Sequence, residues 1–150
     1  MANAQNALPE GENPTITEAM PVQSSPLEGL WLTQNERSVI KIESCMQGLC
    51  GTVHWITQGG MQRDSKNPDA SKSDKPMCGL PILWGFEQDS ETKWEDGTIY
   101  KADEGKTYSS KLELLDENTL KVRGYVGFSF LGETQQWTRV SEENYPSCGI

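Results

Sequence analysis

The chain has 150 residues, a typical length for one domain. Its formal net charge of −9 argues against a nucleic-acid-binding function, because phosphate binding depends on a surface rich in lysine and arginine. The same charge would make an anionic membrane surface repel the protein, and no apolar run in the sequence approaches the roughly 20 residues that a transmembrane helix needs.

Residues 1–26 are rich in Asn, Gln, Glu, Pro, Ser and Thr and show no hydrophobic period. We therefore expect a disordered N-terminal leader over 1–26. The first residues lack the basic and apolar regions of a signal peptide, but Ala2-Asn3-Ala4 resembles the small-residue end of a cleavage site. We expect an exported, periplasmic protein whose mature sequence begins near this point.

The character of the sequence changes at Leu27, and three strands are predicted in succession. Residues 29–33 are mostly apolar and are followed by a polar turn. Residues 38–43 alternate between apolar and charged side chains, as in a half-buried strand. Residues 49–56 are rich in β-branched and aromatic residues, which are typical of a buried strand.

A long irregular stretch follows from Thr57 to Lys75, where Gly, Asp, Ser, Lys, Asn and Pro dominate. Such long loops inside small domains are often functional or mobile, so the role of the whole 57–77 loop stays open at this point. Residues 78–86 are apolar again, but glycine and proline interrupt them. We expect an irregular strand there.

The second half of the chain predicts further short strands separated by tight turns. One of these turns is expected at residues 95–97, where Glu-Asp-Gly stands between two apolar segments. The strands are expected at 92–94, 98–100, 107–115, 120–126 and 133–140.

Eight or nine short strands without an amphipathic helix predict an all-β domain over 27–150. An antiparallel up-and-down barrel of about eight strands is the expected architecture, because closure removes exposed strand edges. An eight-stranded barrel has an interior that side chains just fill, or that holds one small ligand. Gly124, Gly127 and Gly132 are expected to bend the last strands towards closure.

The chain has four cysteines, which allow three disulfide pairings. Gly48 lets the chain reverse between Cys45 and Cys50, so we pair these two residues across a turn between neighbouring strands. Cys78 then pairs with Cys148 and fixes the C-terminal end. Zinc bound with the help of His54 is the alternative, but the spacing typical of zinc sites is missing.

Several ordered blocks between Gly29 and Val140 resemble the bacterial DUF2147 family. The most specific blocks are Gly97-Thr98-Ile99-Tyr100, Gly105-Lys106-Thr107-Tyr108, Arg123-Gly124-Tyr125-Val126-Gly127 and Trp137-Thr138-Arg139-Val140; Gly29-Leu30-Trp31, Leu49-Cys50-Gly51, Asp64, Asn67-Pro68 and Gly79-Leu80 also match. The family's usual Asp-Pro is here Lys101-Ala102, so that loop is expected to differ. The resemblance implies a lipocalin-like barrel exported to the periplasm and carries no agreed activity.

Gly29 and Trp31 on the first predicted strand, with Arg139 on the last, are also similar to a lipocalin arrangement in which an arginine lies over a tryptophan at the barrel floor. A guanidinium over an indole face is a cation–π contact, worth roughly 0.5–2 kcal/mol. We therefore expect Trp31 and Arg139 to close the barrel.

Few residues point to catalysis, and the chain is predicted not to be an enzyme. His54 is the only histidine and has no evident orienting partner, so a structural role is expected. The acidic run from Glu87 to Asp96 is interpreted as a solvated rim, and residues 64–69 as a turn cap and not as a calcium loop. No motif for a phosphate, a cofactor or a nucleophile is present, and neither a metal nor a cofactor is predicted.

The aromatic residues favour a ligand cavity, since small-molecule sites are mostly apolar. The candidate lining residues are Trp55, Trp84, Tyr100, Tyr108, Tyr125 and Phe128. The first functional hypothesis is a periplasmic barrel that binds a small apolar or amphipathic molecule. A filled barrel acting as an envelope interaction or structural protein is the alternative, and a hydrolase-type enzyme is the weaker one. The sequence indicates neither the ligand nor the oligomeric state.

Overall fold

The computed structural model describes residues 25–46, 48–57, 59–128 and 130–148, and its regular elements are nine strands. They are β1 Gly29–Leu32, β2 Ser38–Cys45, β3 Gly48–Ile56, β4 Pro81–Trp84, β5 Glu87–Gln88, β6 Lys93–Lys101, β7 Lys106–Asp116, β8 Thr119–Tyr125 and β9 Gly132–Val140. In these ranges no helix is long and apolar enough to cross a membrane. Apart from Ser25 and Pro26, the predicted leader lies outside the described residues.

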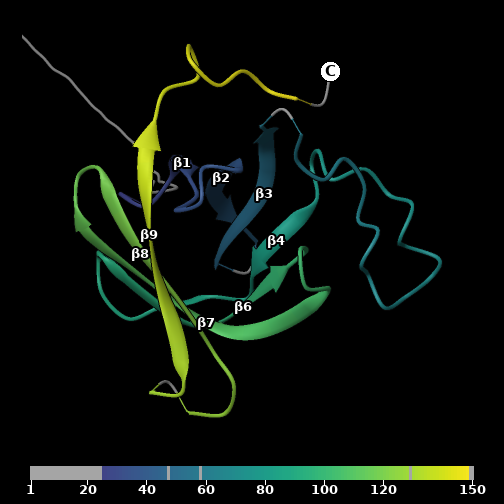
Figure 1. Ribbon diagram of the computed structural model, residues 1–150. Helices are drawn as coiled ribbons and strands as arrows, with labels where there is room; N and C mark the ends of the chain where they lie inside the picture. The colour runs from purple at the N-terminus through teal and green to yellow at the C-terminus, as the bar shows by residue number, and fades with distance from the viewer. Residues whose placement is uncertain (1–24, 47, 58, 129, 149–150) are drawn as a thin grey trace, which may run out of the picture.

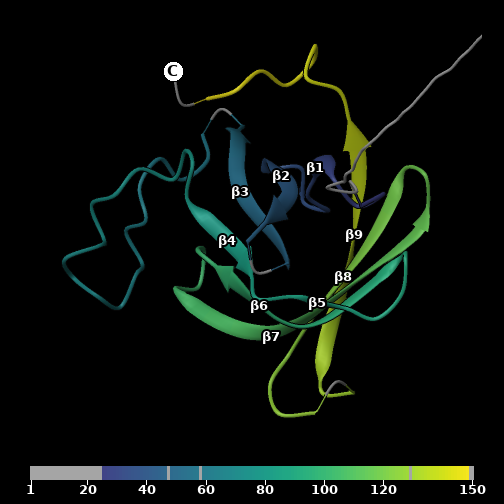
Figure 2. The ribbon, with the colours of Figure 1, turned by 180° about the vertical axis from the view of Figure 1, so that it is seen from behind.

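The strands form one closed antiparallel ring. Their order in the sheet is β4-β3-β2-β1-β9-β8-β7-β6-β5, and an additional pairing of β4 with β6 joins the two sides. Figures 1 and 2 show the strands following one another around this ring. Eight strands therefore make the barrel, and the short β5 is added at the edge of β6. The prediction of an all-β up-and-down barrel is confirmed.

One predicted turn is wrong. Residues 95–97 do not reverse the chain, because β6 runs without a break from Lys93 to Lys101. The register against β7 shifts between Trp94 and Gly97, and Asp96 has a φ of 61°. This is a β-bulge, in which an extra residue bends the strand. Gly97 fits there because a Cβ atom would lie 2.3 Å from the Phe86 ring.

Two tryptophans form the centre of the core at one end of the barrel. Trp31 and Trp137 are both almost completely buried. The Trp31 indole Nε1 donates a hydrogen bond to the Leu27 carbonyl oxygen at 2.9 Å, so the polar atom of this buried ring is satisfied. Leu27 is itself fully buried and belongs to the same core cluster.

Arg139 lies over Trp31 and joins three separate segments. Its guanidinium carbon is 4.3 Å from the centroid of the Trp31 ring. Its nitrogens donate hydrogen bonds to the carbonyl oxygens of Glu117 at 2.7 Å, Glu28 at 2.8 Å and Pro26 at 2.7 Å. The same end of β9 pairs directly with β1, Trp31 opposite Arg139. The predicted contact between these two residues is present.

Gly29 is required by this arrangement. Its φ is +135°, a conformation that side chains disfavour, and a Cβ atom at this position would lie 2.4 Å from Nη1 of Arg139. The absence of a side chain therefore lets the guanidinium reach the Glu28 carbonyl.

Both predicted disulfides are present, Cys45–Cys50 and Cys78–Cys148. The second bond ties the C-terminal segment after β9 to the chain before β4. Along the way Tyr145 packs edge-on against Trp55, with ring centroids 4.9 Å apart, and the Cys148 amide donates to the His54 carbonyl. The segment thus lies beside the end of β3, on the side that carries the 57–77 segment (Figure 1).

We expect Arg139→Ala to lower the free energy of unfolding by roughly 2–3 kcal/mol, because the cation–π contact and three hydrogen bonds are lost together. Trp31→Ala should cost about 3–5 kcal/mol, as large buried rings do. Urea unfolding should show that the double variant loses less stability than the two single variants lose together, since both changes break the same contact. Exposed Arg37→Ala is the control, expected within about 0.5 kcal/mol of the parent. Strict additivity would contradict the contact.

We expect thiol titration to detect no free thiol in the native protein and four after reduction and unfolding. Reduction should also free the C-terminal segment, which limited proteolysis would detect as new cleavage after Val140. Two reactive thiols in the native protein would contradict the pairing.

Candidate functional site

The barrel contains a cavity of about 390 Å³. Its wall comes from inward side chains of five strands and from Trp137 at its inner end: Ile40, Val53, Ile82, Ile99, Val122 and Trp137. All of these wall residues are buried and apolar. Of the two buried tryptophans, Trp137 lines the cavity and Trp31 does not.

The entrance is formed by the four connections at the open end of the barrel. They are the β1–β2 turn, the 57–77 segment, the β6–β7 turn and the β8–β9 hairpin, which contribute Arg37, Met61, Met77, Asp103 and Leu131, among others. An interior that is apolar in depth and polar at its rim has the composition of a small-molecule site.

Three polar side chains at the entrance are bound to one another. Lys101 Nζ lies 3.0 Å from a carboxylate oxygen of Glu104, and the Tyr108 hydroxyl donates to the other oxygen at 2.5 Å. The Tyr108 hydrogen bond, followed by Lys101, lowers the pKa of Glu104, and the same two bonds raise the pKa values of Tyr108 and Lys101. Near neutral pH the lysine and the glutamate therefore stay charged, and the tyrosine keeps its proton.

Gly124 leaves part of the cavity open. It lies on β8 two residues from Val122, so both face the interior. A Cβ atom at Gly124 would meet Ile99 at 3.6 Å and Tyr108 at 3.7 Å, which are ordinary contact distances. A side chain at this position would fit the backbone and extend into the space that the glycine leaves.

Of the six aromatic residues predicted to line the cavity, Tyr100, Tyr108 and Tyr125 do so. Trp55 and Trp84 lie outside it, which corrects the prediction. The register of β3 against β2 shifts beside His54, and that of β4 against β3 shifts beside Ile82. Each bulge moves the next residues to the other face of the sheet.

Phe128 is also outside the cavity, since it lies beyond the end of β8 in the β8–β9 hairpin. Its ring stacks on that of Phe130, with centroids 5.5 Å apart, and both rings are exposed. Two neighbours in the hairpin, Val126 and Leu131, are exposed as well, and they contribute to the cavity entrance.

Asp64 is a buried carboxylate that the sequence interpretation missed. It is 1% exposed, and its two oxygens accept hydrogen bonds from the Tyr100 hydroxyl at 2.6 Å and from the Asn67 side-chain amide at 2.8 Å. Burial, and then the bond to Asp64, raise the pKa of Tyr100 above its usual value. The signal in the sequence was the Asp64 and Asn67-Pro68 match to the family pattern, which had been interpreted as a turn cap.

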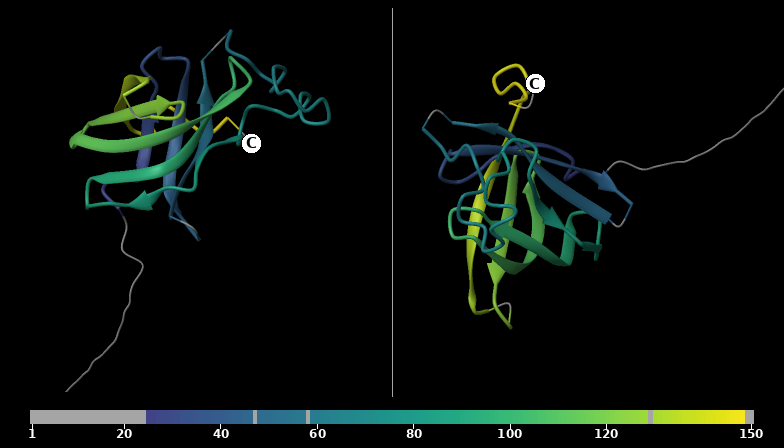
Figure 3. Two further views of the ribbon diagram at one scale, coloured as in Figure 1. Left: turned by 90° about the horizontal axis from the view of Figure 1, so that it is seen from below. Right: turned by 90° about the vertical axis from the view of Figure 1, so that its right-hand side faces the viewer.

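The Asp64 cluster fixes the 57–77 segment to the cavity wall. Lys66 Nζ donates to the Asp103 carbonyl at 3.0 Å, and a Cβ atom at Gly105 would lie 1.9 Å from the Lys66 carbonyl oxygen. Residues 64–66 of the segment are therefore packed closely on the β6–β7 turn. The outer part of the segment extends away from the barrel (Figure 3).

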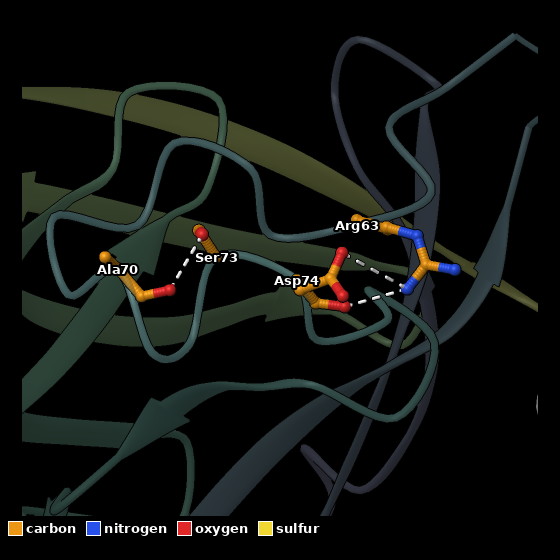
Figure 4. Close-up of polar contacts among 4 residues, drawn as sticks. All are labelled: Arg63, Ala70, Ser73 and Asp74. Atoms are coloured by element: carbon orange, nitrogen blue, oxygen red, sulfur yellow. Dashed lines mark hydrogen bonds and ion pairs between the residues drawn. The ribbon is translucent and has the colours of Figure 1, made fainter.

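The 57–77 segment also has polar contacts within itself (Figure 4). The Arg63 guanidinium donates to the Asp74 carbonyl at 2.8 Å and lies 3.7 Å from its carboxylate, and the Ser73 hydroxyl donates to the Ala70 carbonyl at 3.0 Å. An isolated bridge pairs Arg63 with Pro76. These contacts bring the two ends of the segment together.

The remaining candidates take structural positions. His54 is buried at the outer face of β3, where its Nε2 is 2.9 Å from the Tyr145 carbonyl oxygen. The acidic run is exposed except for the partly buried Glu95, and the Asp89 charge is the main cause of a raised pKa at Glu95. Among the described residues, no group of three or more His, Cys, Asp or Glu side chains is placed to hold a metal ion.

Comparison with known proteins adds a family and a fold. A family model described as "Uncharacterized protein conserved in bacteria (DUF2147)" matches residues 29–139. Protein HP1028 from Helicobacter pylori, described as belonging to the lipocalin family, has a similar structure with a TM-score of 0.71 and 19% sequence identity; the match covers 79% of this chain and 85% of that one. The fold is thus lipocalin-like. The sequence matches no curated protein.

We expect Tyr100→Phe to lower the free energy of unfolding by about 1–3 kcal/mol, because the buried Asp64 carboxylate loses a donor. Because folding raises the pKa of Tyr100, its protonated hydroxyl stabilises the folded protein. This contribution is complete at pH values below the unfolded-state pKa of about 10, and it is lost as the pH rises towards the folded-state pKa. Urea unfolding should therefore show the variant and the parent converging above about pH 10. Tyr125→Phe is the control, expected to change stability by less than about 0.5 kcal/mol. A constant difference at all pH values would contradict the assignment.

Proposed function

We propose that the chain, which belongs to the bacterial DUF2147 family, binds one small apolar or amphipathic molecule inside its barrel. The observation that carries the proposal is the cavity of about 390 Å³, with its apolar wall and polar entrance. This volume falls within the roughly 300–1,000 Å³ of small-ligand sites. The alternative of a filled barrel leaves the cavity unexplained.

The lining indicates how the ligand would lie. An apolar part would pack against Ile40, Val53 and Trp137, where burial of each methylene contributes about 0.8 kcal/mol. A polar part would lie at the entrance, where Lys101, Glu104 and Tyr108 offer both a cation and hydrogen-bonding groups. An amphiphile with one short apolar tail has this distribution of polarity.

A binding role agrees better with the entrance chemistry than a catalytic one. A general acid or base works best when its pKa lies near the working pH. The contacts at the entrance lower the pKa of Glu104 and raise those of Tyr108 and Lys101, so each moves away from neutrality. We infer that this trio orients a ligand and does not transfer protons to it.

The compartment is inferred from the disulfides and the family. The family is a bacterial one, and two disulfides in a small domain are typical of proteins outside the cytoplasm. The periplasm is the bacterial compartment in which such bonds form and persist. We therefore infer a periplasmic binding protein.

Binding can be tested with the neutral fluorescent probe N-phenyl-1-naphthylamine. We expect Gly124→Leu to weaken its affinity at least tenfold, because the new side chain occupies the cavity. Ser109→Leu is the matched control, since it adds the same group on the outer face of β7 next to this position. Titration of the probe fluorescence should separate the two variants while their circular dichroism spectra agree. Equal affinity of Gly124→Leu and the parent would show that the probe binds elsewhere, and the proposal would fail.

A further inference from the structure

The tip of the β8–β9 hairpin carries an unusual concentration of exposed apolar side chains. Val126, Phe128, Phe130 and Leu131 are 64%, 65%, 75% and 58% exposed, and we call these four residues the hairpin patch. Among the described residues only three other large apolar side chains are exposed, Met46, Trp84 and Leu115, and they are scattered over other connections and strands. Single exposed apolar residues are normal, but a contiguous group marks an interaction site.

The position of the hairpin favours contact with another surface. It projects from the barrel at the foot of Figure 1 and of the right-hand panel of Figure 3, on the opposite side from the C-terminal segment. The stacked rings of Phe128 and Phe130 form one apolar surface. Residues 126–131 include no ionisable side chain, although the chain has 22 acidic and 13 basic residues. The tip can therefore leave water without desolvating a charge.

We propose that the hairpin patch inserts into the surface of a lipid bilayer made of zwitterionic lipids. Phe and Leu side chains on a protruding, uncharged element are suited to the interface between headgroups and acyl chains. The net charge of −9 opposes binding to an anionic surface, so zwitterionic lipids are the matching partner.

A second protein molecule fits the patch less well. Four partly exposed side chains of this size offer at most about 600 Å². A stable protein interface buries roughly 800 Å² on each partner. A bilayer sets no such minimum area, and shallow insertion of two aromatic rings is enough for reversible binding.

The patch is continuous with the cavity. Val126 and Leu131 belong both to the hairpin patch and to the cavity entrance. With the tip in the bilayer, the entrance lies at the membrane surface, and an apolar tail can pass between lipid and cavity along these two side chains without crossing water. This transfer rests on the proposed ligand-binding function, whereas insertion of the hairpin does not.

The test uses the intact, oxidised protein and flotation with phosphatidylcholine vesicles. We expect the parent to float with the vesicles and Phe128→Ser/Phe130→Ser to lose at least tenfold in partition coefficient. Met46→Ser is the matched control, because Met46 is the most exposed apolar side chain of the described residues and lies between the two cysteines of the Cys45–Cys50 turn. It should behave as the parent does. Both variants should keep the melting temperature of the parent, since the exchanged side chains are exposed.

A second measurement locates the tip. Phe130→Trp should show a blue shift of its emission on addition of vesicles and quenching by brominated lipid, relative to the parent. Adding phosphatidylglycerol to the vesicles should weaken binding. N-phenyl-1-naphthylamine affinity without vesicles should be the same in Phe128→Ser/Phe130→Ser and the parent, so that failure of the ligand proposal and failure of the membrane proposal are told apart.

Three results would overturn the membrane proposal. They are no flotation of the parent, equal flotation of the double variant, and binding that grows with anionic lipid. Concentration-dependent dimerisation in sedimentation velocity that the double variant loses, without vesicle binding, would assign the patch to a second copy of the chain instead.

Discussion

Closure of the barrel depends on one guanidinium. Arg139 lies over the buried Trp31 ring and donates to carbonyl oxygens of the chain entering β1 and of the β7–β8 turn. A guanidinium has five donors in a planar group that also stacks on aromatic rings, and lysine has neither property. This one side chain therefore joins the first strand, the last strand and a turn between two others, and Gly29 provides the space that it needs.

The two ends of the barrel have different chemistry as a result. The closed end is held by buried rings and hydrogen-bonded carbonyls, whereas the open end carries the cavity and the four connections around it. The connections are themselves fastened: Asp64 binds Tyr100 on β6, and the Cys78–Cys148 bond holds the C-terminal segment beside β3. The hairpin between β8 and β9 differs from them in its exposed apolar tip.

Much of this fold was predictable from the sequence, because alternation and turn residues identify short strands and the Gly48 turn pairs two cysteines. The positions of Trp55 and Trp84 were not, since bulges beside His54 and Ile82 shift the alternation. A bulge is decided by how three neighbouring strands fit together, and a single strand's pattern does not contain that information. The Asp64 site was missed for a related reason: its partner Tyr100 is 36 residues away.

The pairing of β1 with β9 has a consequence for how the protein is made. Arg139 and the Glu28 carbonyl that it binds are 111 residues apart. The second edge of β1 can therefore be paired only after almost the whole chain has been made. Contacts between such distant residues slow folding and leave strand edges exposed meanwhile. A chain that stopped before β9 would keep open edges on β1 and β8, which are templates for pairing with other molecules. Completion of the last strand is thus the step that separates a closed barrel from aggregation.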